Sequence, residues 1–218
     1  MSNFISSTIG KKFIMSISGL FLILFLFVHL TVNTLLFFGP DAFNAGCEFM
    51  ALPFIKVIEP ILALGFIIHI IYATVITLQN QRARPVKYAK QDLSQDSTWA
   101  SRNMYILGGM LFAFLVLHII NFWVKFKFGD VSADVVGHTQ YDLVSTTISQ
   151  PLYGIIYMIA AIMLGLHLSH GFWSAFQTIG FSNDIWRKRW ECIGYIIAVI
   201  FGLGFALIPL FFMLGLNN

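Results

Sequence analysis

Charged residues are scarce in this chain: Asp, Glu, Lys and Arg make up 11% of its 218 residues, whereas hydrophobic residues make up 58%. Soluble domains contain about 25% charged residues, so this composition argues against a soluble enzyme. The formal net charge of +3 is not gathered into a basic, aromatic-rich patch, which argues against nucleic-acid binding. Cys47 and Cys192 form no CxxC or CxxCH motif, so thiol redox chemistry and covalent cofactor attachment are not indicated.

Long apolar runs take the place of the missing charge. Each is long enough for a helix that crosses about 30 Å of hydrocarbon. The runs cover residues 12–38, 53–78, 103–126, 151–177 and 192–216. The first is too long for the apolar region of a cleavable signal peptide, which spans about 7–15 residues. We therefore predict an all-α integral membrane protein, with five transmembrane helices in a single domain covering residues 1–218.

The connections between these runs differ in charge, and this difference predicts the orientation. Basic residues in short connections remain on the cytoplasmic side. One side has a marked excess of them: Lys11, Lys12, Arg82, Arg84, Lys87, Lys90, Arg102, Arg187, Lys188 and Arg189. On the other side Lys56, Lys125 and Lys127 are mixed with acidic residues. We expect a cytoplasmic N-terminus and an external C-terminus.

Histidines are the main ionisable residues within the runs. His138 lies in an external connection and is expected at the surface, whereas five others lie within the runs: His29, His69, His118, His167 and His170. Ionisable residues at membrane depth are costly and indicate function. At 1.5 Å per residue, His29 and His118 lie at one outer level, while His69 and His167 lie about 15 Å from the inner face. The set forms two pairs, each from two different helices.

Two imidazoles that face each other from different helices suit the axial positions of a b-type haem. Two such pairs at two depths predict two haems. A lone histidine in a helix is more often a packed core residue, and a row of histidines could also relay protons in a transporter. A relay needs acids nearby, and only Glu59 lies at depth. His170 is three residues from His167 on a similar helix face, so it could replace His167 as a ligand.

Four segments around these histidines are similar to a known family. They read FLFVHLTVN from Phe25, LGFIIHIIYA from Leu64, LHIINFW from Leu117 and HLSHGFWS from His167. In order and spacing they resemble the dihaem cytochrome b subunit (cytochrome b558 family) of succinate:menaquinone oxidoreductase and quinol:fumarate reductase. This family has five helices in a single membrane anchor.

The resemblance implies that His69 and His167 ligate a proximal haem b, and that His29 and His118 ligate a distal one. His170 matches a position that is not a ligand in the family. The resemblance also implies two partner subunits on the cytoplasmic side, an iron–sulfur protein and a flavoprotein with FAD. Menaquinone would react near the distal haem. Whole complexes often pair in this family.

Further residues are weaker candidates. Residues near the predicted inner haem could contact its propionates or macrocycle: Ser16, Ser18, Arg102 and Gly171. Polar or aromatic residues near the outer level could contact quinone: Asn33, Glu48, Asn121 and Trp123. Some family members carry a glutamate two residues before the fourth ligand. This chain has Gly165 there, so a proton path through that position is in doubt.

Together these features predict the membrane-anchor cytochrome b subunit of a succinate dehydrogenase or fumarate reductase in the bacterial cytoplasmic membrane. It would pass electrons between the iron–sulfur subunit and a quinone pool, and would not itself oxidise succinate. One alternative is the cytochrome b anchor of another membrane oxidoreductase, such as a hydrogenase. A second is a haem-free transporter with a histidine relay.

Overall fold

The computed structural model describes residues 7–83, 98–129 and 139–216, and these residues contain helices but no strand. Arg84, Lys87, Lys90 and His138, which entered the predictions above, lie outside the described residues. The helices are α1 (Thr8–Thr34), the 3₁₀ turn η2 (Leu35–Phe38), α2 (Pro40–Met50), α3 (Pro53–Lys56), α4 (Ile58–Arg82), α5 (Trp99–Arg102), α6 (Met104–His118), the π-helical turn η3 (Ile119–Trp123), α7 (Val124–Phe128), α8 (Gln140–Ser149), α9 (Pro151–Thr178) and α10 (Asp184–Met213).

Five helical stretches of the described chain are long and apolar enough to cross a membrane, as the composition predicts. They are Thr8–Phe38, Pro53–Arg82, Met104–Phe128, Pro151–Thr178 and Asp184–Met213. The last begins earlier than the predicted residue 192. Asn183 causes this, because its side-chain oxygen accepts hydrogen bonds from the backbone N–H groups of Ile185 and Trp186 and so caps the new helix. The basic residues 187–189 therefore lie in the first turns of α10, and not in a loop.

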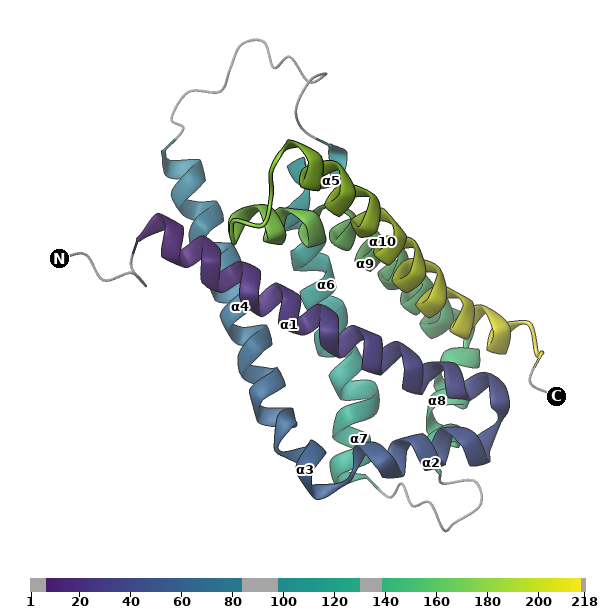
Figure 1. Ribbon diagram of the computed structural model, residues 1–218. Helices are drawn as coiled ribbons and strands as arrows, with labels where there is room; N and C mark the ends of the chain where they lie inside the picture. The colour runs from purple at the N-terminus through teal and green to yellow at the C-terminus, as the bar shows by residue number, and fades with distance from the viewer. Residues whose placement is uncertain (1–6, 84–97, 130–138, 217–218) are drawn as a thin grey trace.

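The long helices form a bundle in which α1 contacts α4, α9 and α10, and α6 contacts α9 (Figure 1). One end of the bundle holds the start of α1, the end of α4, the short α5 and the turn between α9 and α10. We call this the inner end, following the predicted orientation. The opposite end holds α2, α3, α7 and α8, and we call it the outer end. The short helices α2 and α8 pack together there.

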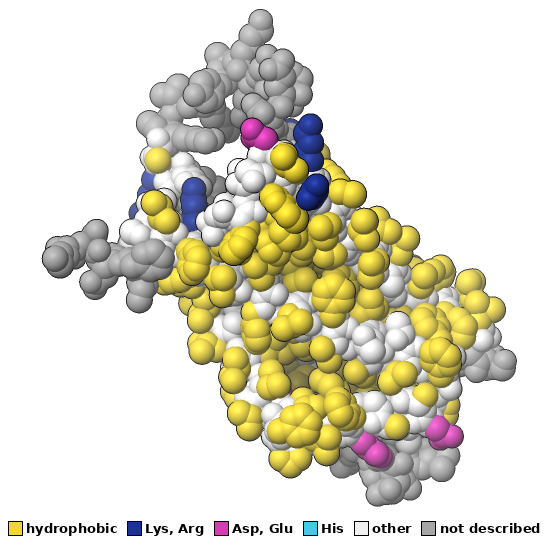
Figure 2. Space-filling view, viewed as in Figure 1, with side chains coloured by type: hydrophobic (Ala, Val, Ile, Leu, Met, Phe, Trp, Pro, Cys, Tyr) yellow, Lys and Arg dark blue, Asp and Glu magenta, His cyan; other side chains and the backbone are white. Residues whose placement is uncertain are grey.

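The outside of the bundle is apolar over most of its length. Figure 2 shows a broad hydrophobic surface, with Lys and Arg gathered near the inner end. Large side chains such as those of Leu24, Ile106 and Val199 are more than half exposed, at 64%, 60% and 57%. Exposing so much apolar area to water would be costly. This surface therefore suits contact with lipid.

The tightest helix packing lies between α9 and α10, which share the most extensive contact in the fold. A Cβ atom at Gly165 would lie 2.9 Å from the carbonyl oxygen of Ala198 and 3.3 Å from the Cα of Gly202. The two backbones touch at this point, as small residues allow in membrane helices. A larger residue at Gly165 would collide with the α10 backbone, so the close packing of α9 against α10 explains the glycine there.

Candidate functional site

The first histidine pair lies toward the outer end, between α1 and α6. The imidazole rings of His29 and His118 have centroids 5.6 Å apart and planes inclined by 85°. Two imidazoles that bind one metal ion from opposite sides have centroids about 6 Å apart, since each metal–nitrogen bond is about 2 Å long. The depths read from the sequence predict this pair, and the fold brings its two rings together.

Aromatic side chains surround this outer pair. His29 contacts Phe25 and Phe205, with ring centroids 5.2 and 5.7 Å away. His118 contacts three further rings, those of Phe114, Phe122 and Tyr157, at 5.7, 5.3 and 5.9 Å. The neighbours come from α1, α6, η3, α9 and α10. Such a flat-sided, apolar environment suits an aromatic macrocycle or a ring-shaped ligand.

The π-helical turn η3 follows His118 directly. Such turns inside α-helices often mark functional sites. Here the turn places the buried Asn121 so that its amide donates to the hydroxyl of Tyr157 at 3.2 Å. The Tyr157 hydroxyl accepts this bond and keeps its own proton for another acceptor. Sequence reasoning named Asn121 and missed Tyr157, which lies 36 residues away and has no motif of its own.

The second histidine pair lies toward the inner end. His69 lies on α4 and His167 lies on α9. A Cβ at Gly19 would lie 3.1 Å from Cε1 of His69, which is a tight contact, whereas one at Gly108 would lie 3.6 Å from Cε1 of His167, an ordinary van der Waals distance. The rings of His29 and His118 are therefore in contact, whereas the pairing of His69 with His167 stays a prediction from their depths.

His170 lies close to this inner pair but is turned toward the start of α10. Its ring meets the Trp173 ring edge-on, with centroids 4.9 Å apart. The guanidinium of Arg187 lies over the Trp173 ring, 5.6 Å from its centroid. His170 is therefore packed against Trp173 of its own helix.

The hydrogen bonding of the rings bears on whether they can hold a metal. Buried Nδ1 atoms of His118, His167 and His170 have no hydrogen-bond partner among the described residues. Within the same residues there is no group of three or more metal-binding side chains. A haem iron requires two axial side chains at most, because the macrocycle supplies the other four donors. The two pairs fit this requirement, and they do not form a site for a bare ion.

The candidates for propionate and macrocycle contact occupy different environments. Ser16 and Ser18 are buried in α1, at 4% and 8% exposure, whereas Arg102 is exposed at the end of α5. The Ser18 hydroxyl lies 3.4 Å from Nδ1 of His69, so it contacts a predicted ligand directly. A Cβ at Gly171 would make ordinary contacts of 3.7 Å with Met104 and 4.0 Å with His167. The neighbouring protein atoms therefore leave space for a methyl group at Gly171, and contact of this residue with a haem stays a prediction.

The candidates for quinone contact do not form one cluster. Asn33 donates to the backbone carbonyl of His29 at 2.8 Å, so its amide is committed to its own helix. Glu48 is exposed on α2, and Trp123 is 44% exposed with the Lys127 ammonium 5.8 Å from its ring. Of the four, Asn121 is the one with a side-chain contact to a ring beside the outer pair.

Two further residues, Glu59 and Cys47, lie near charged side chains that bear on their chemistry. Glu59, the acid required by a proton relay, forms an ion pair of 2.9 Å with Lys127 at the outer end. Cys47 forms no disulfide, and burial together with the charge of Glu48 raises its pKa to about 12. This agrees with an unreactive thiol.

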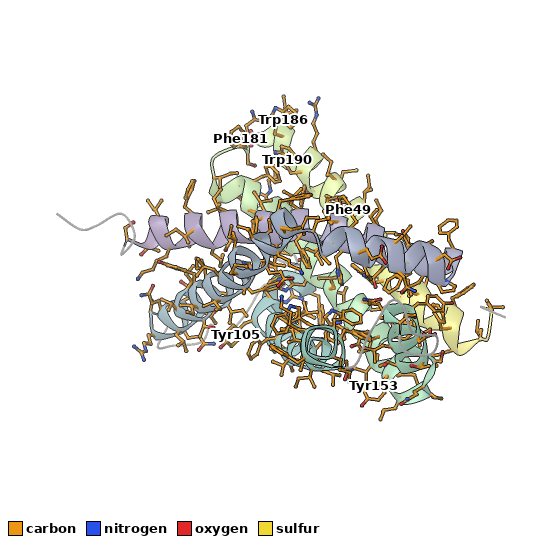
Figure 3. All side chains as sticks on the ribbon, turned by 90° about the horizontal axis from the view of Figure 1, so that it is seen from below. Phe49, Tyr105, Tyr153, Phe181, Trp186 and Trp190 are labelled. Atoms are coloured by element: carbon orange, nitrogen blue, oxygen red, sulfur yellow. The ribbon has the colours of Figure 1, made fainter. Side chains whose placement is uncertain are left out.

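Aromatic side chains also gather where α10 begins. Phe181, Trp186 and Trp190 lie together there (Figure 3), and the Trp190 indole donates to the carbonyl of Phe181 at 2.7 Å. Arg189 lies over the Trp186 ring, 4.9 Å from its centroid. Tryptophan and basic residues are enriched at membrane–water interfaces. This cluster is suited to the inner interface.

One curated protein is similar over most of the chain. It is the succinate dehydrogenase cytochrome b558 subunit of Bacillus subtilis (strain 168), which is 26% identical over 183 residues. The match covers 82% of this chain and 82% of that protein. No protein-family model matches the chain, and no solved structure matches it. The similarity therefore supports a distant relationship between this multi-pass membrane protein and that subunit.

Proposed function

We propose that this protein is the membrane-anchor cytochrome b subunit of a succinate:quinone oxidoreductase (succinate dehydrogenase or fumarate reductase). The observation that supports it most is the contact of the His29 and His118 rings, which come from two different helices. His69 and His167, on two further helices, lie at the second depth read from the sequence. The similarity to a subunit that bears this name supports the same function. We propose that residues 1–218 act as one membrane domain.

Each histidine pair would hold one haem b. His69 and His167 would ligate the inner haem iron, and His29 with His118 would ligate the outer one. When bound, the haems supply iron that accepts and releases one electron at a time. The protein keeps the imidazoles facing each other and surrounds them with apolar side chains that exclude water. Buried aromatic neighbours such as Phe25 and Phe205 do this at the outer pair.

The inner end would face the cytoplasm and the partner subunits. Its basic residues suit this side of a bacterial cytoplasmic membrane. There we expect the iron–sulfur subunit, which would connect the anchor to an FAD-containing flavoprotein. Arg102, Ser16 and Gly171 remain candidates for contact with the inner haem. Whole complexes could associate as dimers, as in the family that the sequence resembles.

Quinone would react at the outer end, and menaquinone is the quinone that the sequence resemblance favours. A quinone site needs an apolar slot and hydrogen-bond donors to the two carbonyls. Tyr157 provides a hydroxyl proton beside the His118 ring, and Asn121 holds that hydroxyl in place. Asn33, Glu48 and Trp123 are weaker candidates, because Asn33 donates to its own helix, Lys127 lies over the Trp123 ring and Glu48 is exposed on α2.

Pyridine haemochrome analysis of the purified complex, with reduced-minus-oxidised spectra, tests the proposal. We expect about two haems b per copy of this chain, together with a co-purified flavoprotein that has FAD. Two haems without that flavoprotein would favour the anchor of another oxidoreductase, such as a hydrogenase. A complete absence of haem would contradict both cytochrome functions and leave the transporter with a histidine relay.

A further inference from the structure

The His69 ring has a hydrogen-bond environment that sets it apart from its predicted partner. Its Nδ1 atom lies 3.2 Å from the backbone carbonyl oxygen of Met15 and 3.4 Å from the hydroxyl of Ser18. The same hydroxyl donates to the Met15 carbonyl at 2.9 Å. All three groups lie on neighbouring turns of α1 and α4, which pack against each other.

These contacts determine where the ring proton lies. A carbonyl oxygen accepts hydrogen bonds and cannot donate, so Nδ1 must provide the hydrogen. Since the Ser18 proton is used on Met15, the Ser18 oxygen is free to accept a share of the same N–H group. The proton therefore stays on Nδ1, and Nε2 keeps a lone pair for a metal.

Gly19 makes this arrangement sterically possible. A Cβ atom there would lie 3.1 Å from Cε1 and 3.4 Å from Nδ1 of His69. A contact of 3.1 Å is tighter than an ordinary van der Waals distance, so a methyl group at this position would require the His69 ring to shift by a few tenths of an ångström. Both residues thus influence the position of the His69 ring. Gly19 leaves space beside the ring, and Ser18 is a hydrogen-bond partner.

His167 and His118 lack this support. Their buried Nδ1 atoms have no partner among the described residues. We infer that the Met15 carbonyl and the Ser18 hydroxyl, with Gly19 beside them, position His69 as the Nδ1–H tautomer and strengthen it as an iron ligand. This inference rests on the proposed function. A hydrogen bond from the distal nitrogen of a ligating imidazole raises its basicity, which stabilises oxidised iron and lowers the reduction potential.

The test is a redox titration of both haems in the purified complex, followed by absorbance and by the low-temperature electron paramagnetic resonance (EPR) spectrum. Ser18→Ala removes one acceptor, so the inner haem should shift to a higher potential while the outer haem stays unchanged. Ser18→Thr, which restores a hydroxyl, should return the potential toward its original value. Gly19→Ala should change the inner haem's EPR signal or remove that haem alone. The His118→Ala variant, in which the inner haem should remain, assigns each titration wave.

Two controls match these changes. Ser174→Ala removes another serine hydroxyl that donates to a carbonyl three residues earlier, and Gly109→Ala adds a methyl group where no atom lies within 4 Å. Both should leave the two haems unaltered. If both haems are present but their potentials and spectra do not change in the Ser18 and Gly19 variants, or if both haems shift together, this inference is wrong while the proposed function stands. A complex without haem overturns the proposed function and this inference with it.

Discussion

The two histidine pairs share a composition but differ in their surroundings. The outer pair lies among aromatic rings, next to a π-helical turn and a buried Asn121–Tyr157 hydrogen bond. The inner pair lies beside glycines and a serine, and His69 is hydrogen-bonded to the backbone of α1. Reduction potential depends on hydrogen bonding and burial around a cofactor. Under the proposed function, the two pairs would therefore serve two different steps of electron transfer, the inner one toward the cytoplasmic partners and the outer one toward quinone.

Removing single histidines should break the comparison most strongly. His29→Ala and His118→Ala should each remove the same haem, because either change deletes one of two axial ligands. His69→Ala and His167→Ala should both remove the other haem. Haem content and reduced-minus-oxidised spectra of the four purified complexes measure this. His170→Ala is the control and should retain both haems. Variants of one pair that lose different haems would contradict the pairing.

A change in the α9–α10 contact should affect both pairs together. Gly165→Leu places a side chain where a Cβ already meets the Ala198 carbonyl at 2.9 Å. Overpacking of this kind costs about 1–3 kcal/mol. Since α9 supplies His167 and α10 supplies Phe205 beside His29, we expect lower thermal stability and reduced occupancy of both sites. Gly109→Leu, in an open position, should have little effect. If the Gly165 variant lost one haem and kept the other, the α9–α10 contact would support only one of the two histidine pairs.

Removal of the Tyr157 hydroxyl should affect the quinone reaction at the outer end and no other step. Tyr157→Phe removes the proton donor beside His118 but keeps the ring. One hydrogen bond is worth about 0.5–1.5 kcal/mol, so the rate of quinone reduction should fall by a factor of about 2 to 13. Reduction of an artificial dye at the flavoprotein should not change. The matched control is Tyr105→Phe, at a half-exposed position on α6. Equal quinone kinetics in both variants would remove Tyr157 from the quinone site.

The smallest effect is expected for Glu59. Its ion pair with Lys127 is exposed, with 37% and 40% of the two side chains accessible. Pairs of this kind contribute about 0–1 kcal/mol. Glu59→Gln should therefore leave haem content and electron transfer unchanged, with a small change in the thermal midpoint. Lys127→Met removes the other partner of this ion pair and should give the same result. Loss of turnover in Glu59→Gln with haem retained would instead indicate a proton path through this acid.

The sequence alone determined the class of fold and the positions of the histidines. Backbone groups in lipid must be hydrogen-bonded internally, so apolar runs of this length become helices whatever their partners. A constant rise per residue then converts sequence position into depth. This is why the two pairs could be predicted from His29, His69, His118 and His167 without any contact information.

Tertiary structure decided what surrounds each ring. Tyr157 meets Asn121, Met15 meets His69, and Gly165 meets the backbone of α10. Each contact joins residues from different helices, and the rotation of one helix against another has no local signature in an apolar sequence. The early start of α10 at Asp184 has, by contrast, a local cause, which is the side-chain cap formed by Asn183. Depth along a helix follows from the covalent chain, whereas facing partners follow from packing.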